Sequence, residues 1–115
     1  MIEIREARDA DERAALLALR HEVFVSEQGV PLDLEIDEHD ETALHLVAAE
    51  DGELLGTCRV LQAGDQAKFG RLVVARHARG RGIGAALLAE AERRARGMGC
   101  ERMVLAAQTS AMGRY

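Results

Sequence analysis

Hydrophobic and polar positions follow two different periods along the first quarter of the chain. In residues 1–6, Ile2 and Ile4 alternate with polar neighbours, which predicts a short strand with one buried face. Asp9 precedes Glu12 by three residues, a spacing that resembles a capping box at a helix start. Apolar residues then recur at helical spacing: Ala15, Leu16, Leu19 and Val23. This period predicts a helix over about residues 10–25.

The middle of the chain has the pattern of strands. Residues 44–49 and 54–61 are apolar-rich runs on either side of Asp51-Gly52, a dipeptide typical of a two-residue hairpin turn. The next segment, 68–75, contains the continuous apolar run Leu72-Val73-Val74. Such a run is expected of a strand that is buried on both faces.

The last third predicts a helix and a further strand. An apolar stripe starts at residue 83 and charged residues cover the remaining surface, so we expect an amphipathic helix of about four turns ending near Gly97. Residues 102–107 form another strand-like run, whereas the acidic stretch 26–41 is typical of a loop. The order strand, helix, hairpin, strand, helix, strand predicts one α/β or α+β sheet domain over residues 1–115.

Charge is divided unevenly between the two halves of the chain, whose net charge is −5. Residues 1–55 hold 16 acidic and 4 basic side chains, and residues 56–115 hold 4 acidic and 11 basic ones. The second half suits an anionic ligand and the first half a cationic one, although solvated surfaces would produce the same division. Because the pI is about 5.4 and no aromatic residues are interleaved with the basic ones, we expect no nucleic-acid binding.

No segment of the sequence predicts export or membrane insertion. The N-terminus enters an alternating pattern directly and no apolar stretch approaches the length of a membrane span, so we expect a cytoplasmic protein. Cys58 and Cys100 lie in apolar surroundings and are interpreted as buried free thiols. The four histidines have no spacing that would join them to either cysteine as ligands, and we expect no metal site.

The candidate chemistry lies between strand 68–75 and the following helix, in the segment Arg79-Gly80-Arg81-Gly82-Ile83-Gly84. Glycines at a helix start let an anion approach unpartnered backbone N–H groups, and arginines add charge-assisted donors, so this turn predicts a pyrophosphate site. A P-loop is excluded because no Gly-Lys-Ser/Thr follows. The dinucleotide motif is disfavoured because the glycines do not follow the strand at once, and the next strand ends in Ala106-Ala107-Gln108 rather than in an acidic residue.

Arg79-x-x-Gly82-x-Gly84 resembles the coenzyme A motif of the GNAT superfamily of N-acetyltransferases. Two further segments are similar to its ElaA- and YjcF-like branch: residues 20–31, Arg20-x-x-Val23-Phe24-Val25-x-Glu27-Gln28-x-Val30-Pro31, with Asp37, Asp40 and His45 downstream, and the stretch from Ala107 to Tyr115. The resemblance covers nearly the whole chain. It implies an α/β (α+β) acyl-CoA N-acyltransferase fold with a mixed, mostly antiparallel sheet flanked by helices.

The resemblance also implies a cosubstrate, acetyl-CoA, and its contacts. The pyrophosphate would bind the turn formed by Arg79, Gly80, Arg81, Gly82, Ile83 and Gly84. The pantetheine arm and thioester would bind backbone groups of Leu72, Val73 and Val74, where the family's strand separates from its neighbour. The family's tyrosine, the general acid for the departing thiolate, corresponds to Tyr115; an ordinary partly buried aromatic is the alternative interpretation.

The base that would deprotonate the attacking amine is not identified by the motif. An alkyl ammonium with a pKa of about 10.4 is almost fully protonated at pH 7, so attack needs a base or a water chain. Many relatives carry a carboxylate in the strand before the motif, where this chain has Gly70. The remaining candidates are Glu27, Glu35, Asp37 and His45. A solvated acidic loop and a structural strand histidine are the alternative interpretations of these residues.

The resemblance therefore implies transfer of an acetyl group from acetyl-CoA to a small-molecule or peptide amine, by direct attack in a ternary complex. It also implies a last helix and two strands beyond Tyr115, supplied by a longer chain or by a partner, which leaves a homodimer open. Gly70, in place of a carboxylate, favours the alternative of a non-catalytic CoA-binding or interaction module with the same fold.

Overall fold

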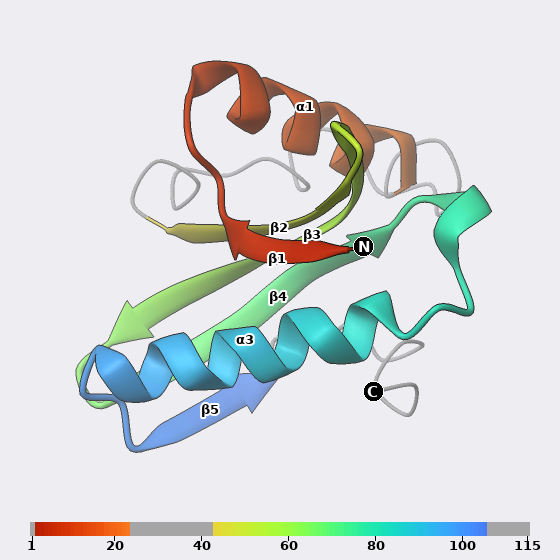
Figure 1. Ribbon diagram of the computed structural model, residues 1–115. Helices are drawn as coiled ribbons and strands as arrows, with labels where there is room; N and C mark the ends of the chain where they lie inside the picture. Colours follow the sequence, from red (N-terminus) through yellow and green to blue (C-terminus); the bar gives the residue numbers. More distant parts are fainter. Residues whose placement is uncertain (1, 24–42, 106–115) are drawn as a thin grey trace.

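The computed structural model describes residues 2–23 and 43–105, and in these residues one five-stranded sheet has a helix on each face (Figure 1). The strands are β1 (Glu3–Glu6), β2 (Leu44–Glu50), β3 (Glu53–Ala63), β4 (Gln66–Val74) and β5 (Arg102–Leu105). They lie in the spatial order β1-β2-β3-β4-β5, with β4 and β5 parallel and the other neighbours antiparallel. The expected mixed, mostly antiparallel sheet is confirmed.

The turns that connect β2, β3 and β4 follow from their sequences. Asp51 and Gly52 have φ angles of 52° and 82°, and a two-residue hairpin turn needs two such left-handed residues to match the twist of its strands. Gly64, with a φ of 63°, supplies the left-handed residue between β3 and β4. These tight turns hold the three central strands in register, so most of the sheet is built from residues close together in the sequence.

Helix α1 (Ala10–Arg20) covers one face of the sheet, and α3 (Ile83–Gly97) covers the other (Figure 1). Oδ1 of Asp9 accepts a hydrogen bond from the backbone N–H of Glu12 at 2.9 Å, which confirms the capping pattern. The guanidinium of Arg5 on β1 donates to the Glu12 carboxylate at 2.6 Å and lowers the pKa of that carboxyl to about 2. This ion pair ties the first turn of α1 to the edge strand.

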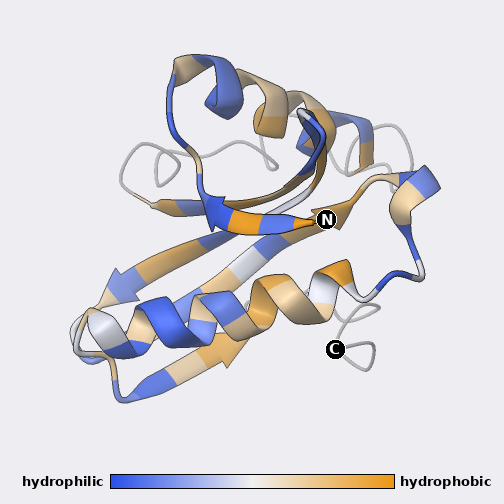
Figure 2. Ribbon diagram, in the orientation of Figure 1, coloured by the Kyte–Doolittle hydropathy of each residue, from blue (hydrophilic) through white to orange (hydrophobic). Residues whose placement is uncertain are grey.

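The larger part of the aliphatic core lies between the sheet and α3. Figure 2 shows apolar positions along the strands and along the first half of α3. The buried residues of α3 are Ile83, Leu87, Ala91 and Ala95. They belong to one cluster with residues of the central strands, such as Leu46 and Phe69. Val23 and Val73 form a separate, smaller cluster with Leu19 of α1.

Some expected boundaries and burials differ from the structure. Helix α1 ends at Arg20, and the chain continues as a π-helical turn through residue 23. The run from Leu72 to Val74 is not uniformly buried. Val73 is buried on the side of α1, whereas Leu72 and Val74 are half-buried and pack against the larger cluster, on the side of α3. The expected loop at 26–41 and the last two positions of strand 102–107 lie outside the described residues.

Candidate functional site

A hydrophilic connection joins β4 to α3 (Figure 2), and its glycines determine its shape. It passes through a short 3-10 turn, η3 (Arg76–Ala78), before reaching α3. Gly80 and Gly82 have φ angles of 86° and 77°, a region that other residues adopt only with strain. Gly82 is the N-cap of α3, and a Cβ atom built on it would meet nothing within 4 Å. The first backbone N–H groups of α3 have no acceptor within the helix, and this bare turn leaves an anion free to approach them.

The two arginines of this turn have acceptors within the protein. Nε of Arg79 donates to the carbonyl oxygen of Val74, at the end of β4, at 3.1 Å. Nη1 and Nη2 of Arg81 each donate to one carboxylate oxygen of Glu50, the last residue of β2, at 3.1 Å. The hydrogen bond from Arg81 lowers the pKa of the Glu50 carboxyl. Both guanidinium groups therefore tie the turn to strand ends, and the sequence predicted neither contact.

Strand β4 contains a β-bulge directly before its last residues. Thr57 of β3 pairs with Val73, but Arg59 pairs with Gly70, so Arg71 and Leu72 together face a single residue of β3. Arg71 has a φ of 51°, an unusual conformation for a residue other than glycine. A bulge bends its strand and changes the direction of the groups that follow. The only sequence signal for it is a glycine, Gly70, inside the strand.

The start of α3 is seated on the sheet through a glycine of β3. A Cβ atom on Gly56 would lie 3.0 Å from the carbonyl oxygen of Val73 and 3.1 Å from Cγ2 of Ile83. On α3, a Cβ atom on Gly84 would lie 3.6 Å from the side chain of Leu72, which is ordinary contact. The absence of a side chain at Gly56 therefore lets the helix start lie directly against the bulged end of β4. A glycine inside a strand is the signal for such a close approach, and the sequence interpretation missed it.

The candidate proton-transfer residues are mostly beyond the described part of the chain. Glu27, Glu35, Asp37 and Tyr115 lie outside the described residues. His45 is buried on β2, opposite Arg59 of β3, so one strand separates it from the bulge in β4. This position is the one expected of a structural strand histidine, and a catalytic role for His45 stays a prediction.

Buried polar residues gather on α1 and the central strands. In residues 2–23 and 43–105 they are Arg20, His45, Thr57 and Arg59. The hydroxyl of Thr57 donates to the carbonyl oxygen of Leu46 at 2.7 Å. The signal for Arg20 is its place in the motif at residues 20–31, whereas nothing in the sequence distinguishes Arg59 from a surface arginine.

Both cysteines are buried and unbridged, as the sequence interpretation held. Burial raises the pKa of the Cys58 thiol and keeps it protonated, which disfavours it as a nucleophile. The described residues contain no group of three or more side chains suited to hold a metal ion. Within the same residues, no helix is long and apolar enough to span a membrane.

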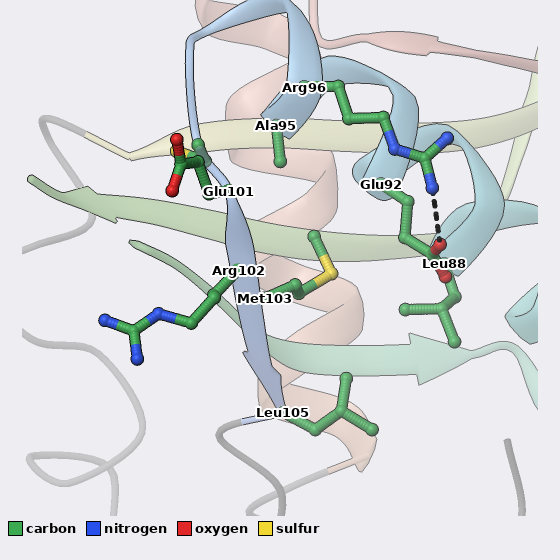
Figure 3. Close-up of a pocket in the computed structure, with 9 residues that line it drawn as sticks. Leu88, Glu92, Ala95, Arg96, Glu101, Arg102, Met103 and Leu105 are labelled. Carbon is green, nitrogen blue, oxygen red and sulfur yellow. Dashed lines mark ion pairs between the residues drawn. The ribbon is translucent and has the colours of Figure 1, made fainter. Parts of the chain in front are cut away.

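A surface pocket lies between the second half of α3 and β5 (Figure 3). Ala95, Met103 and Leu105 give it an apolar wall, and the ion pair between Glu92 and Arg96 lies on its rim. The first α3 residue that lines the pocket is Leu88, and no residue of the turn at 79–84 lines it, so the candidate phosphate turn and this pocket are different places on the molecule.

Comparison with known proteins places the chain in a family. Residues 5–115 match the acetyltransferase (GNAT) family. The chain belongs to that family. YjcF of Bacillus subtilis (strain 168), an uncharacterised N-acetyltransferase, is 30% identical over 109 residues, which cover 95% of this chain and 78% of YjcF.

Solved structures of the same fold agree with this GNAT chain over nearly all its length. The crystal structure of Escherichia coli ElaA matches with a TM-score of 0.85 at 27% identity, over 98% of this chain and 82% of ElaA. An acyl-CoA N-acyltransferase from Pseudomonas aeruginosa matches with a TM-score of 0.82 at 34% identity, over 100% of this chain and 86% of the other. The expected fold and the ElaA- and YjcF-like branch are therefore confirmed, and the GNAT chain is an acetyltransferase whose acceptor substrate is not identified.

Proposed function

We propose that this GNAT acetyltransferase takes its acetyl group from acetyl-CoA and binds the pyrophosphate at the turn from Arg79 to Gly84. The observation that carries the proposal is the pair of left-handed glycines, Gly80 and Gly82, which open α3 without side chains. Backbone N–H groups at a helix start favour anions through both their hydrogen bonds and the helix dipole.

The bulged end of β4 is the proposed site of the pantetheine arm and the thioester. Val73 and Val74 pair with β3 on one side, and none of the residues described at 2–23 and 43–105 pairs with them on the other side. Backbone groups of Leu72, Val73 and Val74 that point away from β3 can therefore bond an extended arm, in the manner of a further strand. Because α3 starts against this part of β4, the arm and the pyrophosphate would bind one continuous surface.

The proposed reaction is direct attack in a ternary complex. The amine nitrogen attacks the carbonyl carbon of the thioester, the C–S bond breaks as the C–N bond forms, and CoA leaves as a thiolate that takes a proton. Tyr115 is the proposed proton donor. Glu27, Glu35, Asp37 and His45 remain the candidates to take the proton of the ammonium group, and the acidic first half of the chain suits a cationic acceptor.

Release of free thiol from acetyl-CoA, measured across a panel of small amines and basic peptides, tests this function. We expect thiol release that depends on at least one amine, together with CoA binding in calorimetry. CoA binding without turnover on any amine would instead favour a non-catalytic module, for which the glycine at position 70 is the supporting observation. Absence of CoA binding would contradict both functions.

Tyr115→Phe tests the proton donor. The change removes the hydroxyl and keeps the ring, so we expect a fall in kcat of about 100-fold, in the range typical of general acid catalysis, with little change in the KM for acetyl-CoA. The measurement is steady-state kinetics with an amine from the panel. An unchanged kcat would remove Tyr115 from the mechanism, and a parallel loss of CoA affinity would indicate that its ring has a structural role.

A further inference from the structure

Glu50 lies at the end of β2, but it contacts the turn before α3. Its two carboxylate oxygens accept from the two terminal nitrogens of Arg81, both at 3.1 Å. Arg81 directly precedes Gly82, the N-cap of α3. The Glu50 side chain is 24% exposed and that of Arg81 is 44% exposed, so the pair is open to solvent and to an incoming ligand. A carboxylate within the protein therefore holds an arginine of the phosphate turn.

A phosphate and a carboxylate bind a guanidinium in the same way. Both accept the parallel pair of N–H groups on the end of the arginine side chain, so the two anions exclude each other from that edge. The bond from Arg79 to the Val74 carbonyl and the packing of Ile83 on β3 hold the turn independently of Glu50. Opening the ion pair therefore leaves the turn in place and makes the end of Arg81 available.

We propose that Glu50 is an internal exchange partner of Arg81, which a phosphate group of CoA displaces, so that Glu50 lowers the affinity of the protein for CoA. The inference rests on the proposed function, because it assumes that CoA binds this turn. Two effects act in the same direction: the ion pair must open, and the displaced carboxylate stays near the bound phosphates. Exposed ion pairs are weak, and we expect the combined effect on affinity to be modest, about three- to fivefold.

Calorimetric titration of CoA into Glu50→Gln tests the exchange. We expect a Kd about three- to fivefold lower than that of the unchanged protein, because the amide keeps the shape but loses the charge. Glu50→Ala provides a second variant should the glutamine variant fold poorly. Glu53→Gln is the matched control, because it removes the same charge from the same hairpin. Glu53 contacts His77, at 3.1 Å, rather than Arg81. We expect the Kd of the Glu53→Gln variant for CoA to stay within about twofold of that of the unchanged protein.

Two further titrations distinguish exchange from a general effect of charge or stability. In an Arg81→Ala background, Glu50→Gln should no longer improve CoA binding, because the residue that changes partners is gone. Pantetheine, which lacks the pyrophosphate, should bind Glu50→Gln and the unchanged protein equally. A gain that persists without Arg81, or that extends to pantetheine, would overturn the exchange.

The outcome for the unchanged protein separates this inference from the function on which it rests. If the unchanged chain binds CoA and Glu50→Gln binds it equally or more weakly, the exchange is wrong and the proposed CoA site stands. If the unchanged chain binds no CoA, both are wrong. A lower KM for acetyl-CoA in Glu50→Gln, with kcat unchanged, would support the same conclusion from kinetics.

Discussion

Gly82→Asp is expected to lower the affinity for CoA by about 100-fold or more while the protein stays folded. An aspartate at the N-cap of α3 would place its carboxylate on the backbone N–H groups that the pyrophosphate needs, and would repel the phosphates. Loss of two charge-assisted hydrogen bonds corresponds to a fall in affinity of about 100-fold or more. Aspartate adopts the left-handed conformation of position 82 at a cost of about 1–2 kcal/mol, so we expect only a modest fall in the free energy of unfolding.

Gly64→Asp provides the matched control for this variant. Gly64 has a left-handed φ of 63° and lies in the turn between β3 and β4, where an added Cβ would likewise meet nothing within 4 Å. The substitution therefore introduces a similar strain and the same charge at a distance from the phosphate turn. Calorimetry should show CoA affinity within about twofold of the unchanged protein. Equal CoA binding by Gly82→Asp and the unchanged protein would refute the assignment of the turn.

Gly56→Val is expected to give the largest loss of stability among these variants. Its Cβ would lie 3.0 Å from the Val73 carbonyl oxygen, 3.1 Å from Cγ2 of Ile83 and 3.4 Å from Cδ1 of Leu87, before its methyl groups are added. Relief requires the start of α3 to move away from the sheet and the backbone of β4 at Val73 to shift as well. Overpacking of this kind costs about 1–3 kcal/mol of unfolding free energy. CoA affinity should also fall, because Ile83, which would be displaced, is the first residue of α3 and directly follows Gly82 of the phosphate turn.

Gly97→Ala is the control that adds a methyl group where there is room. Gly97 is the last residue of α3, and a Cβ atom there would meet nothing within 4 Å. Replacing a helical glycine by alanine should raise the free energy of unfolding by up to about 1 kcal/mol. Urea unfolding measures both changes. If Gly56→Val and the unchanged protein have the same midpoint, the close seating of α3 on β3 is not real.

Local patterns in the sequence predict much of this fold because local chemistry determines it. Asp51-Gly52 specifies its turn through the conformations that these two residues accept, and Asp9 caps α1 through a contact three residues away. The glycines before α3 predict a turn without side chains at the helix start, and the structure adds that two of them, Gly80 and Gly82, are left-handed. Each of these features depends on residues within a few positions of one another.

The features that the sequence did not predict depend on partners far along the chain. Glu50 and Arg81 are 31 positions apart, and no period or motif connects them. The bulge at Arg71 exists only relative to the register of β3, and the crowding at Gly56 depends on the position of α3. The candidate bases at positions 27, 35 and 37 were chosen for their residue types alone, and they stay predictions.

The order of the strands in the sheet has a consequence for how the chain folds. Each strand lies beside the strand that follows it in the sequence, and β2, β3 and β4 are joined by turns of two residues, whereas a long segment separates β1 from β2. Short loops close at low entropic cost, so the three-stranded meander from Leu44 to Val74 is expected to form first. Strand β1 and helix α3 would then pack against this preformed sheet. The strand with the bulge belongs to this early unit, so the part of the proposed cosubstrate surface that β4 supplies would form before α3 docks and adds the phosphate turn.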